Sequence, residues 1–248
     1  MTKIKILTLA LLSACMMLSA KDYKASLFGV KSDGATLNTR SIQTAIDYIS
    51  ANGGGRLVFY VGRYLTGTIQ LKSNVTIQLE EGAILVGTTS VYDYFGIDGV
   101  RAIILADKQE NTGISGKGVI EGQGVLLMNN IKTQIQKGYL KETPAQASPM
   151  LVYMKDCNNV TIEQINMWDA CGDIQSYKGC KKININKISI KSSLSAESKG
   201  ILLADCNDVT LADIYFNTSG PELIYDRTSK NVSVVNCKNE NGKAIRAK

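Results

Sequence analysis

The strongest constraint on the fold is a repeat in the C-terminal half of the chain. The segments NNVTIEQI, KKININKI, NDVTLADI and KNVSVVNC align on their first apolar residue, which is Val160, Ile183, Val209 or Val232. The intervals between these residues are 23, 26 and 23 positions. Earlier copies lie around Val75 and Ile114, and the 46 positions from Ile114 to Val160 would be two periods. Short β-branched strands at this period predict a solenoid whose neighbouring turns share one core.

The repeat predicts an all-β fold, a parallel β-helix of about eight coils between Arg56 and Ile245. Its N-terminal edge would expose apolar surface unless a segment covers it. SIQTAIDYISANGGG predicts a helix for this role, with one apolar face at Ile42, Ala45, Ile46 and Ile49. Residues 126–148 interrupt a coil and predict a loop with a short helix, as either a groove wall or a disordered flap.

Residues 1–20 have the pattern of an export signal, followed by one domain over residues 21–248. Lys3 and Lys5 precede an apolar stretch that is too short to span a bilayer. LSAC, ending at Cys15, resembles the lipobox of bacterial lipoproteins, and the alternative is a secretory signal cut after Ala20. We therefore expect an exported bacterial protein, periplasmic or held at the outer membrane through a lipid on Cys15.

Charge and cysteine content bear on partners and cofactors. The net charge is +6, but the lysines are scattered singly, so no nucleic-acid partner is expected. Apart from Cys15 there are five cysteines, an odd number, and three of them recur at matching places in the repeat. We expect small buried side chains stacked at a corner. Without histidine or a C-x-x-C pair, no metal site or cofactor is expected, and the oligomeric state stays open.

Several glycine-rich motifs then resemble a known family. These are LFGVKSDG at 27–34, GRYLTG at 62–67, LKSNV at 71–75, LEEGA at 79–83 and GKGVIEGQG at 116–124. Together they resemble the N-terminal signature of glycoside hydrolase family 28, the polygalacturonases and related pectin hydrolases. The resemblance is close over residues 27–124 and looser to residue 237. It implies a single-stranded right-handed parallel β-helix, of the pectin lyase-like kind, that acts on pectin.

The same resemblance implies where the catalytic acids should lie. Inverting glycosidases need an acid and a base on opposite sides of the scissile bond. In the family these groups come from an N-x-D-G-x-D strand and a D-D pair one coil later, followed by G-H-G and R-x-K elements. Counting from Asp205 places Lys199 and Leu202 at the two aspartates of the first motif. Glu222 is the acid nearest the expected pair, and the chain contains no histidine.

Three interpretations of this strand stay open. In the first, the strand is ordinary solenoid wall. In the second, it belongs to a non-catalytic glycan-binding groove, where Lys199 meets carboxylates and Tyr177, Trp168 or Tyr153 stacks on sugar faces. In the third, it belongs to a Ca²⁺-dependent uronan lyase. Candidate catalytic residues are Glu222, Lys199 and Asp226, and candidate substrate-binding residues are Asp173, Tyr177 and Lys199. We expect a polygalacturonase-like protein of pectic or other acidic polysaccharide processing, with weak or absent hydrolysis.

Overall fold

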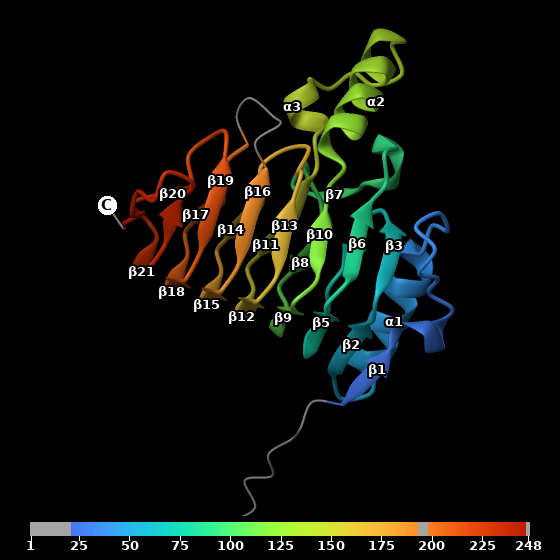
Figure 1. Ribbon diagram of the computed structural model, residues 1–248, viewed down its shortest axis with the longest axis horizontal. Coiled ribbons are helices and arrows are strands. Elements are labelled where there is room, and N and C mark those ends of the chain that lie inside the picture. Colours follow the sequence, from blue (N-terminus) through green and yellow to red (C-terminus); the bar gives the residue numbers. More distant parts are fainter. Residues whose placement is uncertain (1–20, 193–197, 247–248) are drawn as a thin grey trace, which may run out of the picture.

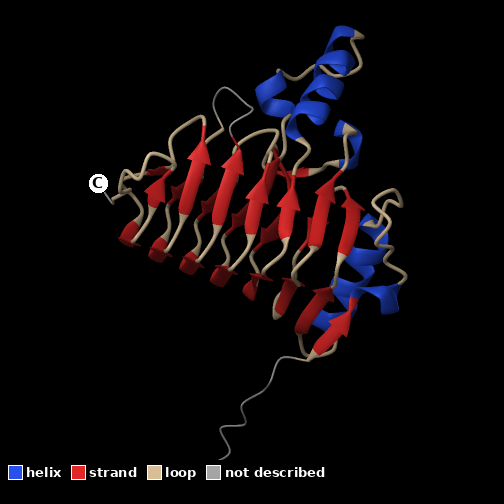
Figure 2. Cartoon of the chain, in the orientation of Figure 1, coloured by secondary structure: helices blue, strands red, loops and turns tan. Residues whose placement is uncertain are grey.

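The computed structural model describes residues 21–192 and 198–246 and shows a parallel β-helix (Figure 1). Successive coils follow one another along the long axis, and each contributes strands to sheets on different sides of the rod (Figure 2). The fold class predicted from the repeat is therefore confirmed. The predicted signal segment, including Cys15, lies outside the described residues.

Three sheets form the walls. The first contains β1 (Asp22–Lys24), β2 (Gly55–Phe59), β5 (Val75–Leu79), β9 (Glu110–Gly116), β12 (Asn158–Glu163), β15 (Lys181–Asn186), β18 (Asn207–Ala212) and β21 (Lys230–Val235). The second contains β3 (Gly62–Thr66), β6 (Ala83–Gly87), β10 (Val119–Glu121), β13 (Asn166–Trp168), β16 (Ser189–Ser192), β19 (Tyr215–Thr218) and β22 (Lys238–Asn239). The third contains β4 (Ile69–Gln70), β8 (Val100–Asp107), β11 (Met150–Lys155), β14 (Gln175–Lys178), β17 (Ile201–Ala204) and β20 (Leu223–Tyr225), with β7 (Gly96–Ile97) antiparallel to β8.

The repeat sets the register of the first sheet. Val160 pairs with Ile183, Ile183 with Val209, and Val209 with Val232, all in parallel strands. The first three side chains are buried in the common core. Each coil thus stacks its apolar position on that of the coil before it, as the alignment predicted.

One part of the alignment was wrong. Ile114 pairs with Ile162, and Thr112 pairs with Val160, in directly neighbouring strands. The 46 positions from Ile114 to Val160 therefore belong to one enlarged coil, because an excursion occupies most of them. The first sheet has eight strands including β1, which leaves seven from β2 onward where about eight coils were expected.

The corners explain the frequent asparagines. The residue just before each aligned position has a positive φ, between 53° and 63°, at Asn74, Asn111, Asn159, Lys182, Asp208 and Asn231. Asn and Asp tolerate this left-handed conformation better than most other residues with a Cβ. Side-chain hydrogen bonds from Asn159 to Asn111 (2.8 Å) and from Asn111 to Asn74 (3.0 Å) then link three coils.

The cysteines are free and buried at all five described positions. Cys157, Cys180 and Cys206 occupy the same corner of successive coils, and the Cys157 amide donates to the Cys180 sulfur (3.4 Å). The Cys206 thiol donates to the Tyr177 carbonyl of the coil before it (3.3 Å). The stack predicted from the repeat is confirmed.

The N-terminal end of the rod is covered by η1 (Ala25–Phe28) and α1 (Thr39–Ala51). Ile42, Ala45, Ile46 and Ile49 are the buried residues of α1. The helix ends where Asn52 and the following glycines take non-helical conformations. Both the helix and its apolar face agree with the prediction.

The excursion between β10 and β11 forms α2 (Gly124–Gln136) and α3 (Pro144–Ala147), which project from the rod (Figure 1). The helix is longer than the short one expected. Leu127 and Ile131 are buried on one side of α2. Asn130 Oδ1 accepts a hydrogen bond from the amide of Val91 in η2 (Val91–Asp93). Within the described part of the chain, no helix has the length and apolar character needed to cross a membrane.

Candidate functional site

A hollow of about 640 Å³ lies between the α2–α3 excursion and the starts of β11, β14 and β17, and is called the α2 groove below. Its polar lining comprises Asn129, Lys132, Ser148, Cys171, Asp173 and Lys199. Lys199 Nζ lies 3.7 Å from Asp173 Oδ2, and their side chains are 37% and 18% exposed. The structure therefore brings two of the residues singled out from the sequence into one accessible site.

Backbone contacts between adjacent coils fix this pair. The Lys199 amide donates to Asp173 Oδ1 (3.0 Å), and the Ile174 amide donates to the Lys199 carbonyl (2.9 Å). The buried Ser198 hydroxyl donates to the Gly172 carbonyl (2.8 Å). Hydrogen bonds thus join the segments that lead into β14 and β17, and these segments carry the carboxylate and the ammonium at the groove.

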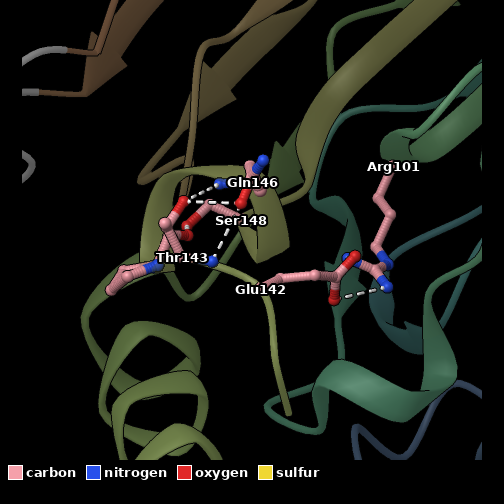
Figure 3. Close-up of polar contacts among 6 residues, drawn as sticks. Arg101, Glu142, Thr143, Gln146 and Ser148 are labelled. Atoms are coloured by element: carbon pink, nitrogen blue, oxygen red, sulfur yellow. Dashed lines mark hydrogen bonds and ion pairs between the residues drawn. The ribbon is translucent and has the colours of Figure 1, made fainter.

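The excursion is held in place as a wall (Figure 3). Both terminal nitrogens of Arg101 lie 3.0 Å from the carboxylate oxygens of Glu142, in the segment between α2 and α3. Thr143 and Gln146 form a capping box at the start of α3, each side chain binding the other's backbone amide. The Ser148 hydroxyl donates to the Pro144 carbonyl (2.7 Å). Of the two structures predicted for this excursion, the protein forms the groove wall.

Glu222 and Asp226 do not lie in the lining of the groove. Glu222 accepts a hydrogen bond from Asn239 Nδ2 (2.8 Å). Asp226 turns back onto the corner after β20, where it accepts from the Ser229 hydroxyl (2.8 Å) and the Asp205 amide (3.2 Å). Desolvation alone would raise the pKa of Asp226, but hydrogen bonds from Thr228, Ser229 and Asp205 outweigh it and lower the pKa to about 2.

The aromatic candidates lie away from the groove. Tyr177 is fully buried in the core, and its hydroxyl donates to Gln175 Oε1 (2.7 Å), so its ring offers no face to a sugar. The prediction that Tyr177 binds substrate does not agree with this position, because the alternation of the strand turns the side chain into the core. Tyr153 is buried against Ala102 and Leu105, and Trp168 is 38% exposed on the second sheet.

Several groove residues had no signal in the sequence. Lys132 and Asn129 come from α2, whose orientation over the sheet depends on the contacts of the excursion. Val125 and Met128 give the same wall an apolar portion. A helical spacing of about one turn between Met128 and Lys132 could have indicated a shared face, but not that this face looks onto Lys199.

The arrangement suits binding of an anion with apolar surface. Two ammonium groups, Lys132 and Lys199, and one carboxylate, Asp173, line the groove beside apolar side chains. Of the three candidate acids Asp173, Glu222 and Asp226, only Asp173 belongs to the lining of the groove. Among the residues that the structure describes, no three His, Cys, Asp or Glu side chains gather in a way that could hold a metal ion.

Comparison with known proteins gives the relationships of the chain. It matches Glycosyl hydrolases family 28 over residues 56–246. It is 37% identical over 114 residues to exo-poly-alpha-D-galacturonosidase of Dickeya chrysanthemi, a match covering 39% of this chain and 19% of that protein. The chain spans less than half the length of each curated relative it matches.

Solved structures extend the comparison. A crystal structure from Parabacteroides merdae ATCC 43184, which carries the name glycosyl hydrolase, is 47% identical with a TM-score of 0.87, covering 92% of this chain and 99% of that one. The family 28 exopolygalacturonase of Yersinia enterocolitica is 19% identical with a TM-score of 0.78, covering 89% and 49%, and shares the fold. The match over residues 56–246 shows that this chain belongs to glycosyl hydrolase family 28.

Proposed function

We propose that this chain binds a pectic or similarly acidic polysaccharide in the α2 groove without hydrolysing it by the family's acid–base mechanism. The observation that carries the proposal is the ion pair of Lys199 with Asp173, at the strand where the family resemblance implies catalytic aspartates. The protein would then act in polysaccharide processing as a glycan-binding β-helix.

The charges in the groove favour an anionic ligand. The Lys199 ammonium forms an ion pair with the Asp173 carboxylate at 3.7 Å, while Lys132 has no ion-pair partner among the described residues. An ion pair exposed to this degree contributes about 1 kcal/mol or less, so a ligand carboxylate can compete with Asp173 for the ammonium. Val125 and Met128 offer apolar surface to the carbon face of a sugar ring.

Hydrolysis of the family type would need acids that these residues do not supply. Glu222 is engaged with Asn239, and the low pKa of Asp226 leaves it without a proton to donate at neutral pH. The same placements disfavour the Ca²⁺-dependent lyase alternative, because Glu222 and Asp226 stand outside the groove that holds Lys199 and Asp173.

The sequence of residues 1–20 supports export as part of the proposal. Lys3, Lys5 and the apolar stretch after them fit the pattern of an export signal, and the LSAC segment would place a lipid on Cys15. Residues 21–248 would then form one β-helix domain in the periplasm or at the outer membrane, where it meets polysaccharide.

The test combines binding and product analysis. Wild-type protein and Lys199→Glu are passed over an affinity gel carrying polygalacturonate, and the same proteins are incubated with soluble polygalacturonate with and without Ca²⁺. We expect retention of the wild type, weaker retention of the variant, and no unsaturated products. Absence of retention, or unsaturated products that depend on Lys199, would contradict the proposed function.

A further inference from the structure

A second hollow lies at the other end of the third sheet, between α1 and β4, and is called the α1 cavity below. It has a volume of about 450 Å³. Arg40, Gln43 and Asp47 line it from α1, Gln70 and Lys72 line it from β4 and the residues after it, and Phe95 lines it from the segment before β7. These α1 residues lie on the opposite side of the helix from its buried apolar face.

The frame of the α1 cavity is fixed by hydrogen bonds. Gln43 Nε2 donates to the Gln70 carbonyl (3.0 Å), and the Gln70 amide donates to Gln43 Oε1 (2.8 Å), which joins α1 to β4. The buried Thr68 hydroxyl binds the Ala102 carbonyl (2.7 Å) and accepts from the Phe95 amide (3.2 Å). Phe95 is therefore held by its backbone while its side chain stays 47% exposed.

The charges of the α1 cavity are not neutralised by the fold. Neither Arg40 nor Lys72 takes part in an ion pair with another described residue. Asp47 is the single acid of the lining, and it accepts from Gln43 Nε2 (3.0 Å). Two cations and one anion leave a net charge of +1 around an exposed aromatic ring.

From this arrangement we propose that the α1 cavity is a second binding site for a carboxylate-bearing sugar unit, and that one acidic polysaccharide chain occupies both it and the α2 groove. This rests on the proposed function. Arg40 and Lys72 would bind the carboxylate, and Phe95 would pack against the sugar ring. The guanidinium offers two parallel donors to a carboxylate, which an ammonium does not.

The topology allows one chain to reach both sites. In the third sheet β4 is followed in space by β8, β11, β14 and β17, so four strand spacings separate Gln70 from the strand that follows Lys199. At about 4.8 Å per spacing this is roughly 19 Å along the rod. A polymer spans that distance, whereas a short fragment fills one site at a time. Linked contacts of this kind raise the affinity for the polymer more than for the fragment.

The experiment is a titration calorimetry series with trigalacturonate and long polygalacturonate. The test variant is Arg40→Gln/Lys72→Gln, and the charge-matched control is Lys181→Gln/Lys230→Gln, whose lysines are exposed on the first sheet. Thermal unfolding of each variant checks that it folds. We expect the test variant to lose about tenfold in affinity for the polymer, since each of the two exposed charge contacts contributes roughly a few-fold. The control should lose less than about twofold.

The outcomes separate the two proposals. If Lys199→Ala weakens binding of trigalacturonate while the Arg40/Lys72 variant binds polymer like the wild type, the α1 cavity is not a glycan site and the α2 groove remains one. If the wild type binds neither ligand, both proposals fail. A loss in the Arg40/Lys72 variant that is confined to the polymer supports the second site.

Discussion

The two ends of the rod are built from the same kind of strand but differ in what covers them. At the N-terminal end α1 packs over the first coils, and Ile42, Ile46 and Leu57 are completely buried. In the last described coil Val232 and Val234 occupy the equivalent inward positions and are only partly buried, while Val235 is 56% exposed. Burial of a position in a solenoid therefore depends on the layer next to it as much as on the residue itself.

The largest expected effect tests this difference directly. Ile46→Ala leaves a cavity under α1 and should lower the free energy of unfolding by roughly 2 to 5 kcal/mol. Val234→Ala in the last described coil removes partly exposed methyl groups and should cost less than about 1 kcal/mol. Urea unfolding followed by circular dichroism measures both. Equal losses at the two positions would show that the ends are equally well packed.

The next effect concerns the middle of the rod, where an ion pair joins the excursion to β8. Arg101→Ala removes the partner of Glu142, and we expect a loss of about 1 kcal/mol in stability because the pair is only partly exposed. The same change should weaken glycan binding, since it loosens the wall of the α2 groove. Glu142→Gln keeps the shape and one acceptor and should have a smaller effect on both. If Arg101→Ala binds glycan as tightly as the wild type, the ion pair that holds the excursion does not contribute to binding in the α2 groove, which would contradict this prediction.

A smaller effect depends on pH and on the C-terminal corner. The pKa of Asp226 is about 2 in the folded protein against an ordinary value of 3.8, so its ionised form stabilises the fold. This contribution is complete above pH 3.8 and is lost as the pH falls toward 2. Because Asp226 is exposed, the contribution is about 1 kcal/mol or less. Asp226→Asn should be less stable than the wild type at neutral pH and equal to it near pH 2, measured by thermal unfolding. A difference that is independent of pH would contradict this assignment.

The smallest effect is expected in the groove itself. Asp173→Asn removes the carboxylate that is paired with the Lys199 ammonium. The affinity for polygalacturonate should therefore rise about threefold, as expected from loss of a partly exposed ion pair. Asn keeps an oxygen that can accept from the Lys199 amide, so stability should change little. Calorimetric titration measures the affinity. A decrease would mean that Asp173 contacts the ligand favourably.

The sequence predicted the fold more completely than the site. Val160, Ile183 and Val209 could be aligned because a stacked coil repeats its apolar positions, and the Ile42–Ile49 face followed from helical periodicity. Ile114 was aligned with Val160 but pairs with Ile162, two residues later. The interval was also counted as two periods, because an excursion has no periodicity that reveals how many coils it replaces.

The site depends on side-chain contacts between coils, which the periodicity of the sequence does not reveal. Lys199 and Asp173 were singled out from the sequence, but their pairing depends on how the entrances of β14 and β17 are joined. Lys132 reaches the groove because the buried Leu127 and Ile131 and the Arg101–Glu142 ion pair hold the excursion against the rod. Tyr177 was misjudged since an aromatic residue in an alternating strand fits either face, and here the core takes it.

The central claim, that this family 28 chain lacks the family's hydrolysis, is tested most directly by measuring new reducing ends. Wild-type protein and Glu222→Gln are incubated with polygalacturonate, and an active family 28 polygalacturonase serves as the positive control. We predict that neither protein releases reducing ends above the buffer background. Steady release by the wild type that disappears in Glu222→Gln would contradict the claim and identify Glu222 as a working acid.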